Sequence, residues 1–271
     1  MEHNETRSLF RLHKICVLIP TYNNAQTLEH VVSDALVYTD QVIVVNDGST
    51  DATLAILEKI SAIRKVSYGT NRGKGYALRT GFAFALSEGF DYAITMDSDG
   101  QHFAADLPSF LAALNDNADS IIVGARNMNQ STVPGKSSFG NKFSNFWFWV
   151  TTGLRMQDTQ SGYRWYPIRK MRNINFLTRK FEFEIEVLVR SSWNGIPVKS
   201  IPVQVFYPEK GKRITHFRPF TDVTRITILN TVLVLIALFY IKPRDAWRSL
   251  KKKTSDSSFG SNCLTRPNQT H

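Results

Sequence analysis

The residues best suited to chemistry are two carboxylates, Asp97 and Asp99, which follow the short apolar run 92–96. A hydrophobic run of this length, bounded by turn residues, is typical of a buried strand. The strand would place both carboxylates at its carboxyl end, where open α/β sheets bind ligands. Gln101 completes a set of oxygen ligands that suits Mg²⁺ or Mn²⁺ carrying a phosphorylated ligand. An ordinary acidic turn is the simpler interpretation of this motif taken alone.

Polar residues also follow two other apolar runs. Asp47 comes after the run 42–45, and Pro20 and Tyr22 come after the run 15–19. At the same predicted edge of a sheet, the Asp47 carboxylate would accept hydrogen bonds from a base or a ribose. The alternative for Asp47 is a turn that leads into a helix cap. Tyr22 would either stack on a ligand or pack internally.

Basic side chains recur at predicted loop positions. Arg72 and Lys74 precede a predicted helix, whose backbone N–H groups would suit a phosphate, although a solvated basic loop explains them equally well. The dinucleotide-binding pattern Gly-x-Gly-x-x-Gly is excluded because its last position is Leu78. Arg126 follows the apolar run 120–123 and can clamp a phosphate with two hydrogen bonds.

Two further loops add candidate groups. The stretch 158–164 contains a carboxylate, a hydroxyl, a glycine and a guanidinium, and the basic stretch 210–216 can close over an anion. Each stretch alone has a solvated turn as its alternative interpretation. Together with the earlier motifs they favour a shared anion-binding site.

Alternating strand and helix patterns must position these residues. Apolar runs at 15–19, 42–45, 65–68, 92–96 and 120–123 alternate with helical patterns at 27–37, 54–60, 75–86 and 107–114. This alternation predicts an α/β fold with a mostly parallel, Rossmann-like sheet and helices on both faces. The second half is less regular, with an aromatic stretch at 139–154, a helix at 181–193 and a strand at 198–206.

Composition narrows the class of protein. The chain has 271 residues, is 42% hydrophobic and carries a net charge of +10, half of which lies after residue 241. A nucleic-acid-binding protein more often spreads its basic face over the folded domain, so no nucleic-acid partner is expected. Cys16 and Cys263 give neither a disulfide framework nor a metal spacing, which indicates a reducing compartment. The first 14 residues lack the apolar core of a signal peptide.

The sequence predicts four segments: an N-terminal tail (1–14), a catalytic domain (15–220), an apolar helix (221–245) and a disordered basic polar tail (246–271). The core of the helix, 226–241, would span about 24 Å, less than the roughly 30 Å of a bilayer core. A buried helix, an interfacial helix and a marginal span all remain open. Its basic flank favours attachment to the cytoplasmic face of a membrane. Aromatic residues within 143–149 would form a second interfacial surface or pack in the core.

Taken together and in this order, the motifs resemble the family 2 glycosyltransferases of the type-A fold. The closest resemblance is to the polyprenyl-phosphate branch, which includes the dolichyl-phosphate mannose and glucose synthases. The matching stretches are 19–23, 45–51, 71–75, 96–101, 123–126 and 158–164. Six motifs in the right order within residues 15–220 are far more specific than any one of them.

The resemblance implies roles for three groups of residues. The nucleotide sugar would be held by Pro20, Tyr22, Asp47, Asp97 and Arg213, together with Lys74 at the start of its helix. The ion, Mg²⁺ or Mn²⁺, would be held by Asp97, Asp99 and Gln101. The acceptor phosphate would meet Arg126, Ser161 and Arg164, with Lys142 standing for a second basic residue of the branch.

The implied reaction is an inverting transfer of a hexose from a UDP- or GDP-sugar to a polyprenyl phosphate. Its catalytic residues would be Asp99, which neutralises the departing diphosphate through the metal, and Arg126, which binds the acceptor. A lipid phosphate needs no general base, whereas a hydroxyl acceptor needs one, for which Asp158 is the candidate. A hydroxyl acceptor on a lipid or glycan, and a non-catalytic sugar-nucleotide-binding subunit, are the alternatives.

Overall fold

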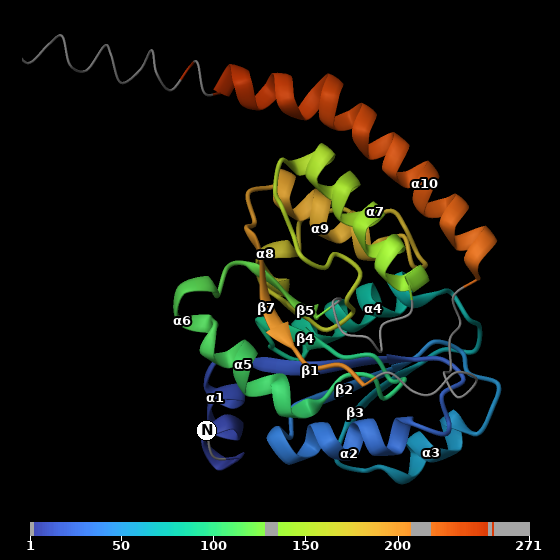
Figure 1. Cartoon of the computed structure of the whole chain (residues 1–271). Helices are drawn as coiled ribbons and strands as arrows, with labels where there is room; N and C mark the ends of the chain where they lie inside the picture. Colours follow the sequence, from blue (N-terminus) through green and yellow to red (C-terminus); the bar gives the residue numbers. More distant parts are fainter. Residues whose placement is uncertain (1–2, 128–134, 207–217, 249–250, 252–271) are drawn as a thin grey trace, which may run out of the picture.

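One seven-stranded sheet organises the catalytic part of the chain (Figure 1). The computed structural model describes residues 3–127, 135–206, 218–248 and 251. The strand order is β3-β2-β1-β4-β6-β5-β7, and only β6 runs antiparallel to its neighbours, which confirms the mostly parallel sheet. The strands are β1 (Ile15–Thr21), β2 (Val42–Asn46), β3 (Arg64–Ser67), β4 (Tyr92–Thr95), β5 (Ile121–Arg126), β6 (Arg164–Tyr166) and β7 (Val198–Val203).

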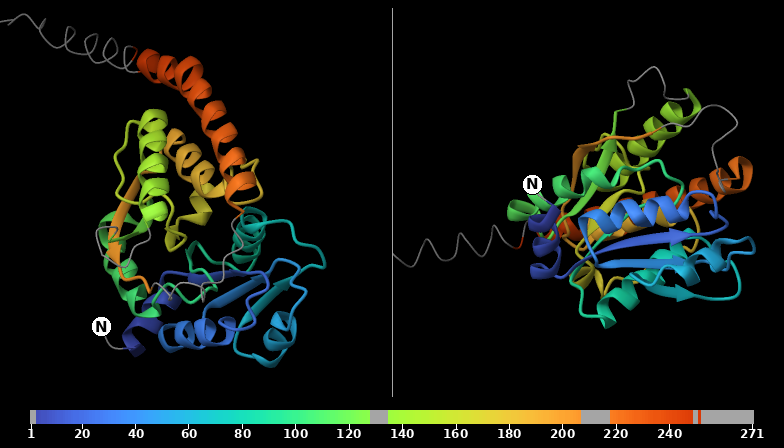
Figure 2. Two further views of the ribbon diagram at one scale, coloured as in Figure 1. Left: turned by 45° about the vertical axis from the view of Figure 1, so that its right-hand side comes forward. Right: turned by 90° about the horizontal axis from the view of Figure 1, so that it is seen from below.

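Helices cover both faces of this sheet, because successive side chains of each central strand point to opposite sides. In β1, Val17 packs in one core cluster and Leu18 in the other. The first face is covered by α1 (His3–Leu12), α2 (Leu28–Tyr38), α3 (Thr53–Lys59), η1 (Ala104–Asp106), α5 (Leu107–Ala112) and α6 (Leu114–Asn117). The second is covered by α4 (Lys74–Ser87), α7 (Gly135–Thr152), α8 (Ile168–Met171) and α9 (Phe183–Trp193) (Figure 2).

The carboxyl ends of the parallel strands bring the predicted motifs to one edge. Thr21 at the end of β1 pairs with Asn46 at the end of β2, and β4 runs beside β1 in the same direction. Because β6 is antiparallel, it begins at that edge, where Arg164 pairs with Thr95. The loop that precedes β6 therefore enters the site between β4 and β5.

Two segments differ from the sequence-based expectation. Residues expected as an N-terminal tail contain α1, in which Phe10 is fully buried against the sheet. Only Thr6 and Phe10 of this helix are buried, so its apolar stripe is too narrow to stand out in the sequence. The three-residue strand β6 is likewise shorter than any periodicity can reveal.

The C-terminal helix is longer than its apolar core. It consists of α10 (Pro219–Ile236), a π-helical turn η2 (Ala237–Ile241) and a continuation to Arg248. The 29-residue stretch Phe220–Arg248 is long and apolar enough to cross a membrane, and at 1.5 Å per residue it measures about 43 Å. Leu233 and Ala237 are buried on its inner side, and the helix lies along α7 and α9 (Figure 1).

Helix α7 divides its aromatic residues between the core and the surface. Phe148 is fully buried, so of the two alternatives it takes core packing. Phe143, Phe146 and Trp149 are exposed. An interfacial role is therefore available only to the outer aromatic residues of this helix.

Candidate active site

The loop after β4 carries the predicted metal ligands in a fixed conformation. Asp99 accepts a hydrogen bond from the backbone N–H of Gln101 at 3.0 Å, which closes a tight turn. The intervening Ser98 is held by Asn24, whose amide donates to its hydroxyl at 2.6 Å, and by Thr27, whose hydroxyl donates to its carbonyl at 2.6 Å. The residues that lead into α2 therefore fix the backbone of the loop that carries Asp97 and Asp99.

The charged side chains of this loop affect one another's ionisation. Burial and the neighbouring negative charge of Asp97 both raise the pKa of Asp99. Burial also opposes ionisation of Asp97, but the positive charge of Lys74 and the nearby His102 ring lower its pKa overall. A cation beside Asp99 would relieve the repulsion between the two carboxylates.

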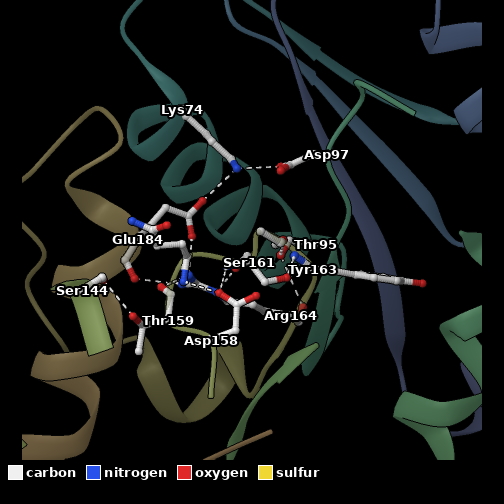
Figure 3. Close-up of polar contacts among 12 residues, drawn as sticks. Lys74, Thr95, Asp97, Ser144, Asp158, Thr159, Ser161, Tyr163, Arg164 and Glu184 are labelled. Carbon is white, nitrogen blue, oxygen red and sulfur yellow. Dashed lines mark hydrogen bonds and ion pairs between the residues drawn. The ribbon is translucent and has the colours of Figure 1, made fainter. Parts of the chain in front are cut away.

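Figure 3 shows a row of alternating charges that runs inward from Asp97. The Lys74 ammonium lies 2.6 Å from Asp97 Oδ1 and 2.8 Å from Glu184 Oε1. Glu184 Oε2 lies 2.9 Å from Arg164 Nη2. Burial favours the neutral amine of Lys74, yet the two carboxylates outweigh it and raise its pKa above the usual value. Lys74, predicted to bind the donor, is therefore placed against the metal-binding motif.

Arg164 and Ser161 occupy the interior of the loop 158–164. Arg164 is 0% exposed, and its guanidinium donates to the carbonyls of Ser161 at 2.6 Å, Thr159 at 3.0 Å and Glu184 at 2.9 Å. The Ser161 side chain is also buried. The direct acceptor contacts predicted for these two residues are not available in this arrangement, because both side chains support the loop from inside.

Asp158 and Arg126 form a buried pair at the end of β5. Asp158 is 0% exposed and accepts two hydrogen bonds from the Arg126 guanidinium, at 2.6 and 3.1 Å. It also accepts from the backbone N–H groups of Arg126, Gln160 and Ser161 at 3.0–3.2 Å. Burial opposes its ionisation, but these donors lower its pKa below the usual value. A carboxylate held in this way positions Arg126 and is a poor proton acceptor.

Asp47 fastens the basic loop that precedes α4. Its carboxylate accepts from the backbone N–H groups of Arg72 and Gly73, each at 2.8 Å, and from the Asn71 amide at 3.1 Å. These two N–H groups, which come just before α4, therefore bind Asp47 in this structure. A Cβ at Gly48 would lie 2.5 Å from the Asn71 nitrogen, so the turn after β2 and this loop are in direct contact.

The remaining predicted residues lie at three places. Pro20 is buried in β1, and Tyr22 is half-buried just beyond that strand. Lys142 is exposed on α7. Arg213 lies outside the described residues, as does the whole basic stretch 210–216.

The donor set at the β4 edge fits a divalent cation that is shared with a ligand. No cluster of three or more His, Cys, Asp or Glu side chains suited to a metal occurs among the described residues. Two carboxylates and an amide are fewer protein ligands than a closed metal site has. Mg²⁺ characteristically binds through one or two carboxylates and completes its shell with phosphate oxygens and water. Asp97, Asp99 and Gln101 therefore fit an ion on a nucleoside diphosphate.

Sequence reasoning missed Glu184 and His102. Glu184 is buried on α9, and the His102 ring lies 3.8 Å from Asp97 Oδ2. The signal for Glu184 was available: Val187, Leu188 and Ser191 share its helical face, and a carboxylate on such a face is buried and needs a partner. Nothing in the sequence distinguished His102 from a loop residue.

We predict that Gly162→Ala disables the site. A Cβ at this position would lie 2.5 and 2.8 Å from the Asp97 carboxylate oxygens and 2.8 Å from the Lys74 ammonium. Displacing the carboxylate by even about 1 Å should reduce sugar transfer roughly 100-fold. Gly69→Ala is the matched control, because a Cβ there meets nothing within 4 Å. Activity assays of both variants, with thermal unfolding to confirm folding, make the comparison. Equal activity would contradict this packing.

Comparison with known proteins shows the family of this chain. Residues 16–181 match the family described as Glycosyl transferase family 2. Glycosyltransferase AglJ of Haloferax volcanii is 30% identical, over 77% of this chain and 68% of its own. Polyprenol monophosphomannose synthase of Mycolicibacterium smegmatis is 28% identical, over 72% of this chain and 78% of its own. Dolichyl-phosphate beta-glucosyltransferase of Homo sapiens is also 28% identical, over 87% of this chain and 78% of its own.

Solved structures support the same fold. Glucosyl-3-phosphoglycerate synthase from Mycobacterium tuberculosis, in complex with Mn²⁺, UDP and glucosyl-3-phosphoglycerate, superimposes with a TM-score of 0.63. It is 18% identical, and the match covers 88% of this chain and 84% of that one. The type-A glycosyltransferase fold is thereby confirmed. The chain belongs to glycosyl transferase family 2, and it is a glycosyltransferase.

Proposed function

We propose that the protein transfers a hexose, with inversion, from a nucleotide sugar to a polyprenyl phosphate at the cytoplasmic face of a membrane. The observation that carries this proposal is the Asp158–Arg126 pair, which offers the acceptor a cation rather than a base. An acceptor that is already an anion suits such a site, because its oxygen attacks without losing a proton. The names of the polyprenol and dolichyl-phosphate relatives support the same acceptor class.

The side chains divide the work between donor and acceptor. Asp47, with Pro20 and Tyr22 nearby, lines the nucleoside side at the carboxyl ends of β1 and β2. Asp97, Asp99 and Gln101 would hold Mg²⁺ or Mn²⁺, which supplies positive charge to the departing diphosphate. Arg126, oriented by Asp158, would meet the acceptor phosphate and neutralise its charge as it approaches the sugar.

The decisive experiment is transfer from radiolabelled UDP- and GDP-sugars into organic-extractable lipid, with purified protein, polyprenyl phosphate and Mg²⁺ or Mn²⁺. We expect metal-dependent label in the lipid phase, in a product that mild acid cleaves as it does a glycosyl phosphate. A product that resists mild acid would instead indicate a hydroxyl acceptor. Donor hydrolysis without label in lipid would contradict the lipid acceptor and retain the nucleotide-sugar site.

The exposed side of the C-terminal helix supports membrane attachment. Its outward side chains are mostly large and apolar, and Phe239 is 79% exposed. The full exposed set comprises Phe220, Val223, Ile228, Val232, Leu235, Leu238, Phe239, Tyr240 and Trp247. An apolar face of this extent rarely faces water in a soluble monomer. Basic residues lie on the same helix, at Arg225, Lys242 and Arg248, which suits an anionic lipid surface.

We predict that Leu235→Glu combined with Phe239→Glu releases the protein from vesicles of anionic phospholipid. Both side chains are exposed on the helix, so the charges should weaken membrane binding at least about tenfold without unfolding the chain. Val37→Glu with Leu54→Glu is the control, because these exposed apolar residues lie on α2 and α3, against the other face of the sheet. Vesicle co-sedimentation measures both, and equal retention of the two double variants would contradict this anchor.

A further inference from the structure

We infer that Glu184 is a positioning residue that couples the metal-binding carboxylates to the loop that orients Arg126. This inference rests on the proposed function, which needs both parts of the site. Glu184 lies between two buried cations, with Oε1 2.8 Å from Lys74 Nζ and Oε2 2.9 Å from Arg164 Nη2. One carboxylate on α9 therefore reaches the donor side and the acceptor side at once (Figure 3).

On the donor side, Glu184 shares Lys74 with Asp97. The ammonium lies 2.6 Å from Asp97 Oδ1, so it already occupies one oxygen of a predicted metal ligand. Glu184 offsets part of this positive charge. Without that offset, Lys74 would bind Asp97 more tightly and would repel an approaching divalent cation. The charge of Glu184 thus keeps Asp97 available to a metal.

On the acceptor side, Glu184 anchors Arg164 inside the loop 158–164. The Arg164 guanidinium donates hydrogen bonds to the backbone carbonyls of Thr159 and Ser161 and so fixes the loop backbone. The same loop presents Asp158, which holds Arg126 through two hydrogen bonds. Without the Glu184 carboxylate, Arg164 would remain a buried and poorly compensated cation. The loop 158–164 around it would then be less rigid.

Glu186 shows what a purely structural carboxylate looks like on the same helix. It is also buried, but it accepts from the backbone N–H groups of Leu177 and Thr178, each at 2.8 Å. These two N–H groups belong to the segment before α9. Its ion-pair partner Arg190, at 3.7 Å, lies on α9 itself, and none of these groups belongs to either side of the site. Glu186→Gln is therefore a matched control for the loss of a buried negative charge.

The test compares Glu184→Gln with Glu186→Gln in the full-length chain, without relying on turnover. Mn²⁺ binding in the presence of UDP is titrated by the electron paramagnetic resonance of free Mn²⁺, and amide hydrogen exchange follows the two loops. For Glu184→Gln we expect Mn²⁺ affinity about tenfold or more below wild type and faster exchange in 158–164. For Glu186→Gln we expect wild-type Mn²⁺ affinity and faster exchange only around 177–178. Glu184→Asp, which retains the charge, should recover part of the Mn²⁺ affinity.

Three results would overturn the inference. They are wild-type Mn²⁺ affinity in Glu184→Gln, an equal loss in Glu186→Gln, and unchanged exchange in 158–164 when Mn²⁺ binding falls. The proposed function is judged separately, from transfer of sugar to lipid by the wild-type chain. A failed transfer assay with the expected Mn²⁺ and exchange results would reject the acceptor and leave the coupling by Glu184 standing.

Discussion

Replacing Asp99 with alanine is expected to reduce sugar transfer by about three orders of magnitude and to leave the fold intact. Asp99 is one of only two carboxylates in the predicted cation site, and preorganised charge at a departing group typically contributes 10²–10³-fold or more. Burial beside Asp97 makes its negative charge costly in the folded state. Removing it should therefore not lower the free energy of unfolding, which thermal unfolding of the variant measures.

The control for this prediction lies at the other end of β4. Asp91 precedes the strand and pairs with Arg169 at 3.1 Å, far along the strand from the loop that carries Asp99. Asp91→Ala should retain sugar transfer, because it removes a carboxylate that no part of the site contacts. Full transfer by Asp99→Ala would refute the metal assignment, and loss in both variants would point to a general effect on β4.

The sequence predicted the fold and the edge of the site because both depend on local patterns. Apolar runs followed by turn residues located β1, β2, β4 and β5, and parallel pairing then placed their polar ends together. Among the described strands only β6 was missed, because its position between β4 and β5 depends on a loop that folds back into the sheet. No periodicity reports such a return of the chain.

The roles of individual residues were harder to predict, because they depend on which charges meet. Arg164 and Arg126 both lie near glycine or turn residues in the sequence. Yet Arg164 is wholly buried, whereas Arg126 pairs with Asp158 at the edge of the sheet. Glu184 lies on α9, about twenty residues after the last motif, and its carboxylate pairs with both Lys74 and Arg164. These distinctions come from tertiary packing, which sequence spacing does not encode.

The second large effect is expected for Asp158→Asn, on stability. The substitution keeps the shape of the side chain but removes the negative charge that accepts two hydrogen bonds from the partly buried Arg126 guanidinium. Breaking a buried ion pair from one side typically costs about 3–5 kcal/mol of the free energy of unfolding. Urea unfolding at neutral pH measures the loss, and a decrease below about 1 kcal/mol would contradict the pairing seen here.

The pH dependence of this loss has a definite sign. Because the folded-state pKa of Asp158 is below its unfolded value of about 3.9, the stabilisation is complete above that pH and disappears as the pH falls through the folded pKa. The difference in the free energy of unfolding between wild type and Asp158→Asn should therefore decrease only below about pH 4. Asp106 gives the opposite case, because burial raises its pKa. The free energy of unfolding of wild type, relative to Asp106→Asn, should therefore increase as the pH falls through that raised pKa.

The same variant decides whether Asp158 acts as a general base. If it only positions Arg126, Asp158→Asn should raise the KM for the acceptor and preserve the shape of the pH–rate profile. If it accepted a proton from a hydroxyl acceptor, kcat would collapse and the acidic limb of the profile would vanish with the carboxylate. The five donors around Asp158, with its depressed pKa, favour the first result. That result would support an acceptor that reaches the enzyme as an anion.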